Sequence, residues 1–449
     1  MAEVLPKDVL VRCGGRTLHV TSYLAAMGAG GGYQEVKETF ARADGGTPIA
    51  TLIDRNVGNG QILYTAAADK VRIEYPPALS GLVDQFGYPY CGPLLESART
   101  NAWTKSQKLD DAVWTKDAAS VTPNVGAGAD SSSTADLIVE DGTNNLHGFE
   151  RTTPALTDNT QQSVSVFASY FGTRLWFRIR TTDKSGALNS TFFNIGAGTI
   201  GTIGAGHTDV KIEGPIGRLG AQGYRCSLSF NSAAGATPPL VQFFLATADN
   251  SGAYLGDGVS GMVFWGLQFE VDKPFRSSYL ATDAATISRA ADSLRLPYLF
   301  GTNADITTLV RLARPVFVDT VGSLPNGPVM FRFGSANPCL YSNFAIATRS
   351  FVSRIFDPAD HNVITAVPAG AEIRQVSQWK NLRTAGQTAQ DVGSGYGAFT
   401  SAAVALAALF DQTLILGGDG AAGNEINGVL LDFIAARGLR TTAEMLAIP

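Results

Sequence analysis

The middle of the chain repeats one pattern: short segments of alternating apolar and polar residues, each bounded by Gly, Asn, Asp or Pro. The segment RLWFRIR (174–180) is an example, because Phe177 and Ile179 fall on one side of a strand and Arg178 and Arg180 on the other. Successive side chains of a strand point to opposite faces, so each such segment has one apolar face to bury. Two antiparallel sheets packed face to face bury many such faces at once. The pattern therefore predicts an all-β chain built from β-sandwiches.

The stretch Gly261–Val271 differs from the other strand segments, because bulky apolar residues occupy both of its faces. This is typical of a central strand buried between two layers. Pro274 has no N–H to donate, so we expect the strand to end before it. The following residues, 275–292, are small, polar and without periodicity. We expect them to be a hinge-like crossing from one domain to the next.

The length of 449 residues suggests two or three domains. We divide the chain into an N-terminal docking segment at 1–47, a connector rich in Pro and Tyr at 48–100, a first β-sandwich at 101–298 and a second at 299–449. Charged residues make up 16% of the sequence, well below the roughly 25% that is usual. This composition suits a protein that buries surface against copies of itself or other proteins.

Residues 1–47 are too few to bury a core of their own. They must fold onto a partner, onto the body of the chain or onto other subunits. A docking segment and a simple N-terminal flap are both compatible with the sequence. Within it, YQEVKETFARA (33–43) has the spacing for two or three helical turns.

The charge distribution and the hydropathy exclude several classes of protein. The net charge is −5 and no block of basic residues stands out, which argues against a nucleic-acid partner. No apolar run approaches about 18 residues, so we expect no membrane span. The first residues lack the order of a signal peptide, so we expect assembly in a cytoplasm. The four cysteines form no CxxC pair, which favours buried free thiols over a zinc site assembled from distant parts.

Several phrases, taken in order, resemble a group of bacteriophage virion proteins. They are GPLLESARTN (92–101), DDAVWTKDAASVTPN (110–124), SSSTADLIVED (131–141), GYRCSLSF (223–230) and the stretch from WGLQFEV to SRAAD (265–292). In that group these phrases belong to a laminin-G-like, concanavalin-type jelly roll. The resemblance covers roughly residues 50–295.

The end of the chain, with TLILGG and NGVLLDFIAARG, is similar to the end of a laminin-G-like sandwich. The chain departs from the virion proteins at Ser97, where they often have Glu, and at Phe269, where they have Leu. The resemblance implies two consecutive antiparallel sandwiches of the jelly-roll, laminin-G or concanavalin type.

The resemblance also implies a non-enzymatic structural protein of a virion, assembled in the host bacterial cytoplasm. We expect a head or tail appendage, a fibre or spike, that docks to capsid or tail proteins through residues 1–47 and presents its sandwiches to host-surface polysaccharide. A homotrimer is the first expectation for a fibrous appendage. A capsid decoration or cement protein and a polysaccharide depolymerase remain alternatives.

Four charged residues flank the first predicted sandwich: Glu96 and Arg99 before it, and Arg289 and Asp292 after it. They form either a ligand-binding cluster or a structural bracket of ion pairs that fixes the two chain ends. Their opposite charges and flanking positions favour the bracket.

The sequence offers three residues for glycan binding: Trp379 with the adjacent Lys380, and Trp176 in its alternating strand. Aromatic rings have an apolar body suited to packing on a ligand. A glycosidase would need a pair of carboxylates, and the sequence supplies no confident partner for Glu270.

Calcium is possible in the Gly-rich loops, which contain Asp249 and Asp257 and, in the second predicted sandwich, Asp419 and Asn424. Carboxylate and amide oxygens are the ligands that Ca²⁺ prefers. The same residues also favour turns. The sequence implies no other cofactor.

Overall fold

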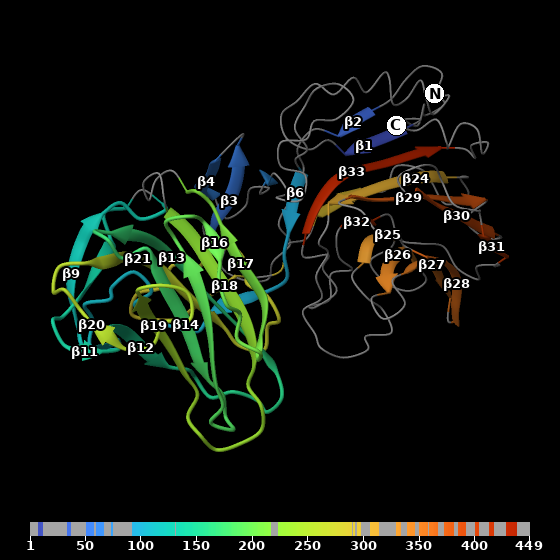
Figure 1. Ribbon diagram of the computed structural model, residues 1–449. Helices are drawn as coiled ribbons and strands as arrows, with labels where there is room; N and C mark the ends of the chain where they lie inside the picture. The colour runs from blue at the N-terminus through green and yellow to red at the C-terminus, as the bar shows by residue number, and fades with distance from the viewer. Residues whose placement is uncertain are drawn as a thin grey trace.

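The computed structural model describes residues 94–130, 132–216, 223–289 and 291 with their side chains, and beyond them the backbone of the strands named below. Every regular element in this part of the chain is a β-strand. None of the described residues forms a helix that could cross a membrane. Figure 1 shows two groups of strands, with β6 (Gly92–Leu95) between them.

The first group forms two six-stranded antiparallel sheets. Sheet 1 has the order β17-β18-β13-β21-β10-β9, and sheet 2 the order β16-β15-β14-β19-β12-β8. The strands of sheet 1 are β9 (Ala119–Gly126), β10 (Ala135–Glu140), β13 (Gln161–Phe171), β17 (His207–Glu213), β18 (Gly223–Asn231) and β21 (Gly261–Glu270). Those of sheet 2 are β8 (Thr115–Asp117), β12 (Gly148–Thr152), β14 (Trp176–Thr182), β15 (Leu188–Asn194), β16 (Thr199–Ile200) and β19 (Leu240–Ala246). The chain crosses repeatedly between the sheets, as in a jelly roll.

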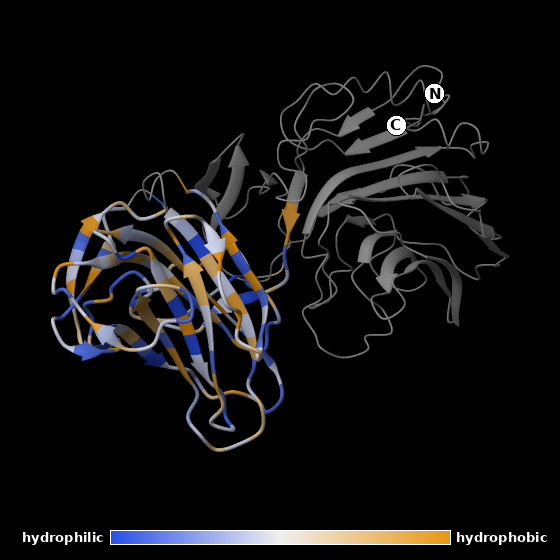
Figure 2. Cartoon of the chain, in the orientation of Figure 1, coloured by the Kyte–Doolittle hydropathy of each residue, from blue (hydrophilic) through white to orange (hydrophobic). Residues whose placement is uncertain are grey.

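The inner faces of the two sheets form one aromatic core. Phe149 stacks on Phe243 with ring centroids 4.9 Å apart, and Phe264 from the opposite sheet meets Phe149 edge-on at 5.1 Å. Trp103 and Trp114 join the same cluster. Figure 2 shows hydrophobic and hydrophilic residues alternating along these strands. The predicted alternation is therefore the one that builds the core.

The central strand β21 contains a β-bulge at Gly266. Its pairing with β13 shifts register between Ser165 and Phe167, and Gly266 has φ of +63°. The extra residue reverses which side chains face inward, so that Leu267 joins the core while Trp265 points to the outer face of sheet 1. Both faces of this strand are buried, as the sequence predicts.

Residues 275–282, which we call the covering segment, pack on the outer face of sheet 1, and this corrects the expectation of a hinge-like crossing. Tyr279 is 1% exposed and packs with Trp265 and Phe167, with ring centroids 4.9 Å and 5.8 Å away respectively. The Tyr279 hydroxyl lies 2.6 Å from the Ser106 hydroxyl. Residues 275–282 lack periodicity because individual contacts hold them in place and they form no strand. At least as far as Thr282, which is 5% exposed, the covering segment belongs to the first sandwich.

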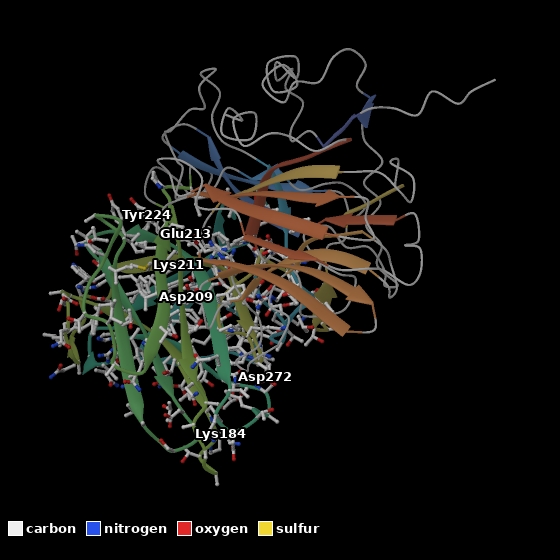
Figure 3. All side chains as sticks on the ribbon, turned by 90° about the vertical axis from the view of Figure 1, so that its right-hand side faces the viewer. Lys184, Asp209, Lys211, Glu213, Tyr224 and Asp272 are labelled. Carbon is white, nitrogen blue, oxygen red and sulfur yellow. The ribbon has the colours of Figure 1, made fainter. Side chains whose placement is uncertain are left out.

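The outer face of the edge strand β17 carries alternating charges. Lys211 Nζ lies 2.8 Å from Asp209 Oδ1, and Glu213 pairs with Arg276 of the covering segment. Figure 3 shows Asp209, Lys211 and Glu213 in succession along this strand. Charges on an edge strand disfavour pairing with a further chain.

The second group of strands forms two further sheets, antiparallel except for the pair of β1 and β2, which confirms the prediction of two consecutive sandwiches. Sheet 3 has the path β2-β1-β33-β24-β29-β30-β31, with β6 paired to β33 and β5 paired to β6. Sheet 4 has the order β23-β32-β25-β26-β27-β28. β28 lies against β30 and β31, so the two sheets contact each other. The strands of sheet 3 are β1 (Asp8–Val11), β2 (Gln34–Val36), β5 (Ile73–Glu74), β24 (Ile306–Ala313), β29 (Glu372–Lys380), β30 (Ala385–Asp391), β31 (Thr400–Ala403) and β33 (Gly428–Arg437). Those of sheet 4 are β23 (Leu294–Pro297), β25 (Val329–Phe333), β26 (Cys339–Ala345), β27 (Ser350–Asp357), β28 (Ala359–Ala366) and β32 (Thr413–Leu416).

Four strands from the first hundred residues, β1, β2, β5 and β6, belong to sheet 3. β1 pairs with β33 in antiparallel fashion, and β6 pairs with the start of the same strand. β2 pairs with β1 in parallel, so the expectation of helical turns at 33–43 is wrong for Gln34–Val36. A separate hairpin, β3 (Thr51–Val57) with β4 (Gly60–Ala66), lies in the predicted connector. The other residues of 1–47 lie outside the described part of the chain, and their docking role stays a prediction.

Candidate functional site

Three of the four predicted bracket residues lie together. Arg289 Nη1 lies 2.8 Å from Glu96 Oε2, and both side chains are almost completely buried. Arg99 donates from Nη1 to the carbonyl of Phe275 at 3.1 Å and lies over the Phe275 ring. Arg99 and Arg289 also face each other in the short pair of β7 (Arg99–Asn101) and β22 (Ile287–Arg289). The cluster ties the two ends of the sandwich, whereas Asp292 lies outside the described residues.

Glu270 is committed to holding the segment that covers sheet 1. Its Oε2 accepts hydrogen bonds from Ser163 Oγ at 3.1 Å and from the Ser277 amide at 2.9 Å, and its Oε1 accepts from Ser277 Oγ at 2.6 Å. Glu270 is 1% exposed. It is therefore a structural residue rather than a general acid.

A second buried carboxylate, which the sequence did not single out, organises the loops at one end of the sandwich. Glu140 accepts from Arg174 Nε at 2.8 Å and from Arg174 Nη2 at 2.6 Å, and also from the Tyr254 hydroxyl at 2.6 Å. Arg174 lies over the Tyr254 ring. Burial, and the hydrogen bond to Glu140, raise the pKa of Tyr254. This arrangement is a fully paired network that fixes loops.

The outer face of sheet 2 combines aromatic rings, cations and carboxylates. Neighbouring strands place these side chains on one surface because residues two apart in β14 face the same way and pair with their counterparts in β15 and β19. We call this surface the arginine face; it consists of Asp117, Glu150, Trp176, Arg178, Arg180, Phe192, Gln242 and Phe244.

Arg178 lies at the centre of the arginine face. Its guanidinium carbon is 5.6 Å from the ring centroids of both Phe192 and Phe244, and Nη1 donates to the carbonyl of Ser251 at 3.3 Å. Burial lowers the pKa of Arg178, and the like charge of Arg180 lowers it further. Stacking between aromatic rings holds the cation in place.

A chain of polar side chains continues across the face from Arg180. Arg180 Nε donates to Gln242 Oε1 at 2.5 Å, and the Gln242 amide donates to Glu150. Asp117 lies beside Glu150, and burial together with this neighbouring carboxylate raises the pKa of Asp117. The face therefore presents cations at one end and carboxylate oxygens at the other.

Trp176 lies at the edge of the arginine face and is half-buried. A Cβ atom at Gly201 would approach both the Trp176 ring and the Asp249 carboxylate, so the loops that contain these residues lie beside the ring. Of the other predicted glycan residues, Trp379 and Lys380 end β29, where Trp379 pairs with Ile306. The surroundings of their side chains lie outside the described part of the chain.

Asp249 and Asp257, the two calcium candidates in the described part of the chain, each accept hydrogen bonds from neighbouring loop residues. Asp249 accepts from the amide and hydroxyl of Thr202, at 2.8 Å and 3.0 Å. Asp257 accepts from Val259 and Ser260, and the Ser260 hydrogen bonds are the main cause of its lowered pKa. Both carboxylates thus make turn contacts. Asp419 and Asn424 lie outside the described residues.

Within the described ranges, no group of three His, Cys, Asp or Glu residues is placed to hold a metal ion. Cys226 is a buried free thiol, and burial raises its pKa. The side chains of the other three cysteines lie outside the part that the structure describes.

His207 links the two sheets of the first sandwich. On β17 of sheet 1, it lies 2.9 Å (Nε2) and 2.7 Å (Nδ1) from the hydroxyls of Thr181 and Thr191, both on sheet 2. Burial lowers the pKa of His207 to about 4. Folding therefore favours the neutral imidazole over the charged form.

The folded protein should consequently lose stability as the pH falls from about 6.5 to about 4, because the unfolded chain takes up a proton there and the folded chain does not. The loss attributable to His207 should approach roughly 3 kcal/mol. Urea unfolding at pH 7 and pH 4.5 should show a smaller pH dependence for His207→Gln than for the native chain. Equal pH dependence in both would contradict the assignment.

Comparisons with known proteins leave the family open. No protein-family profile matches the chain, and no curated protein matches its sequence. Among solved structures, domains LG4-5 of the mouse laminin alpha1 chain align with 66% of this chain and 85% of their own length, at 10% identity and a TM-score of 0.22. The Bacteroides ovatus xyloglucan PUL GH43B aligns with 89% of this chain and 100% of its own length, at 10% identity and a TM-score of 0.23. At such TM-scores neither alignment establishes a shared fold, and the sandwich architecture rests on the strand pairing.

Proposed function

We propose that this chain is a structural protein of a bacteriophage virion. It is a head or tail appendage that docks to the particle through residues 1–47 and attaches to glycans of the host surface. The ordered phrases between residues 92 and 292 support the virion assignment. We propose a homotrimer, the symmetry expected for a fibrous appendage.

The arginine face is the observation that carries the attachment role. It combines an aromatic ring at Trp176 with charged and amide groups on one side of a sheet, and these are the groups that orient a polar ligand. A binding role is preferred to a catalytic one because Glu270, the carboxylate that the sequence offered for catalysis, is held by Ser163 and Ser277.

A glycan array probed with the full chain tests this attachment role. We expect binding to a subset of bacterial surface polysaccharides, and Trp176→Ala should weaken it about tenfold, as expected for truncating an aromatic contact residue. The control is Phe171→Ala, which removes an aromatic side chain that is 47% exposed and lies outside the arginine face. Absence of binding to any glycan would contradict the proposal, and release of reducing ends would indicate a depolymerase instead.

A further inference from the structure

The two arginines of the arginine face have different charged neighbours. Arg178 is 9% exposed, and among the described residues no acidic side chain contributes to its pKa; its charged neighbour is Arg180, of the same sign. Arg174, by comparison, has a bidentate ion pair with Glu140. A buried cation without a nearby anion creates a positive potential at this part of the surface.

Arg180 lies beside Arg178, and its own charge also interacts with the carboxylates of Glu150 and Asp117. Nε donates to Gln242, and within the described part of the chain the two Nη atoms have no hydrogen-bond partner. The guanidinium carbon lies 4.8 Å from the centroid of the Phe244 ring, and the residue is half-buried. Stacking and the Gln242 contact fix the guanidinium plane, and such a fixed fork matches the two oxygens of a carboxylate.

Glu150 and Asp117 restrict where a negative group can bind. Glu150 is joined to Arg180 through Gln242, and Asp117 lies beside it. These carboxylates repel an anion but accept hydrogen bonds from hydroxyl groups. A ligand that fits the whole face therefore has one anionic group at the arginine end and hydroxyl groups along the rest of its length.

We propose that the arginine face recognises a carboxylate-bearing sugar residue, such as a uronic or sialic acid, with its carboxylate on Arg180 and its hydroxyl groups toward Glu150 and Asp117. Arg178, two residues before Arg180 on the same strand, contributes its charge as a positioning residue. This inference rests on the proposed glycan-binding function and specifies the ligand class.

Matched pairs of ligands test the inference. The full chain is titrated at low salt with oligosaccharides that contain galacturonate, glucuronate or sialic acid, and with the methyl ester of each. At least one acid should bind roughly tenfold or more tightly than its ester, because the ester loses a charged hydrogen-bond acceptor. Added salt should reduce that difference.

Variants of Arg180 separate its role from general charge effects. Arg180→Gln should bind the acid about as weakly as the native chain binds the ester. Arg180→Lys should have an affinity for the acid between those of the native chain and Arg180→Gln, because lysine keeps the charge and loses the planar pair of donors. Lys108→Gln is the control, because it removes an exposed cation that pairs with Asp283. It should leave the affinities for the acid and for its ester unchanged. Tryptophan fluorescence confirms that each variant is folded.

The outcomes distinguish this inference from the proposed function. If esters and neutral glycans bind as well as the acids, and Arg180→Gln has no effect, the carboxylate assignment is wrong and the glycan-binding function stands. Preference for sulfated over carboxylated sugars would also overturn the assignment. If no glycan binds at all, both fail.

Discussion

Replacing Asn101 by Asp should destabilise the first sandwich by about 3–5 kcal/mol, although the two side chains have nearly the same shape. Asn101 is completely buried, and its Nδ2 donates to the carbonyls of Leu267 at 3.0 Å and Leu280 at 2.9 Å. Its Oδ1 accepts from the amide of Phe269 at 3.1 Å. The Asn101 side chain thus joins β7, the central strand β21 and the covering segment. An aspartate would set a second oxygen against two carbonyls.

Urea unfolding followed by tryptophan fluorescence measures this effect, because Trp103, Trp114 and Trp265 are buried in the same sandwich. The control is Asn231→Asp, where the exposed side chain uses its oxygen to accept from Ala233 and an aspartate keeps that contact. The loss at Asn101 should shrink at low pH, since a protonated aspartate regains one donor. An Asn101→Asp variant as stable as the control would contradict the role given to this residue.

Replacing Gly266 by Ala should cost about 2–4 kcal/mol, combining a left-handed backbone conformation with overpacking. At φ of +63°, a Cβ would lie 2.8 Å from Phe167 Cδ2 and 3.3 Å from Tyr279 Cζ. Both rings are nearly inaccessible, so neither can move aside cheaply. The same fluorescence assay measures the loss.

Gly142→Ala is the matched control, because a Cβ there would meet no atom within 4 Å. It should leave the free energy of unfolding within about 0.5 kcal/mol of the native value. If the two alanine variants were equally stable, the backbone conformation and the neighbouring rings would not require a glycine at 266.

The sequence predicts the strands and their buried faces better than it predicts the contacts between residues that are distant in the chain. The alternation in RLWFRIR is sufficient to assign Phe177 and Ile179 to the core and Arg178 and Arg180 to the opposite face. The bulge at Gly266 was not predicted, since a glycine inside a strand indicates a possible irregularity without giving its register. The covering segment was expected to be a hinge because its sequence has no periodicity. Its side chains are buried through individual contacts, and such contacts leave no periodic pattern in the sequence.

The arginine face could not be assembled from the sequence. Glu150 and Gln242 lie 92 residues apart and are joined only because β12 pairs with β19. A single sequence contains no information on which strands are neighbours. The ion pair of Glu96 and Arg289 could be predicted from the sequence because residues of opposite charge flank one predicted domain.

We propose that this chain is part of a virion and is attached through its N-terminal segment. The most direct test is a cryo-EM map of the phage particle that carries the chain, at a resolution that traces residues 1–47. We expect these residues to contact capsid or tail subunits and the arginine face to point away from the particle. A free, monomeric protein whose residues 1–47 touch no other subunit would overturn the proposal.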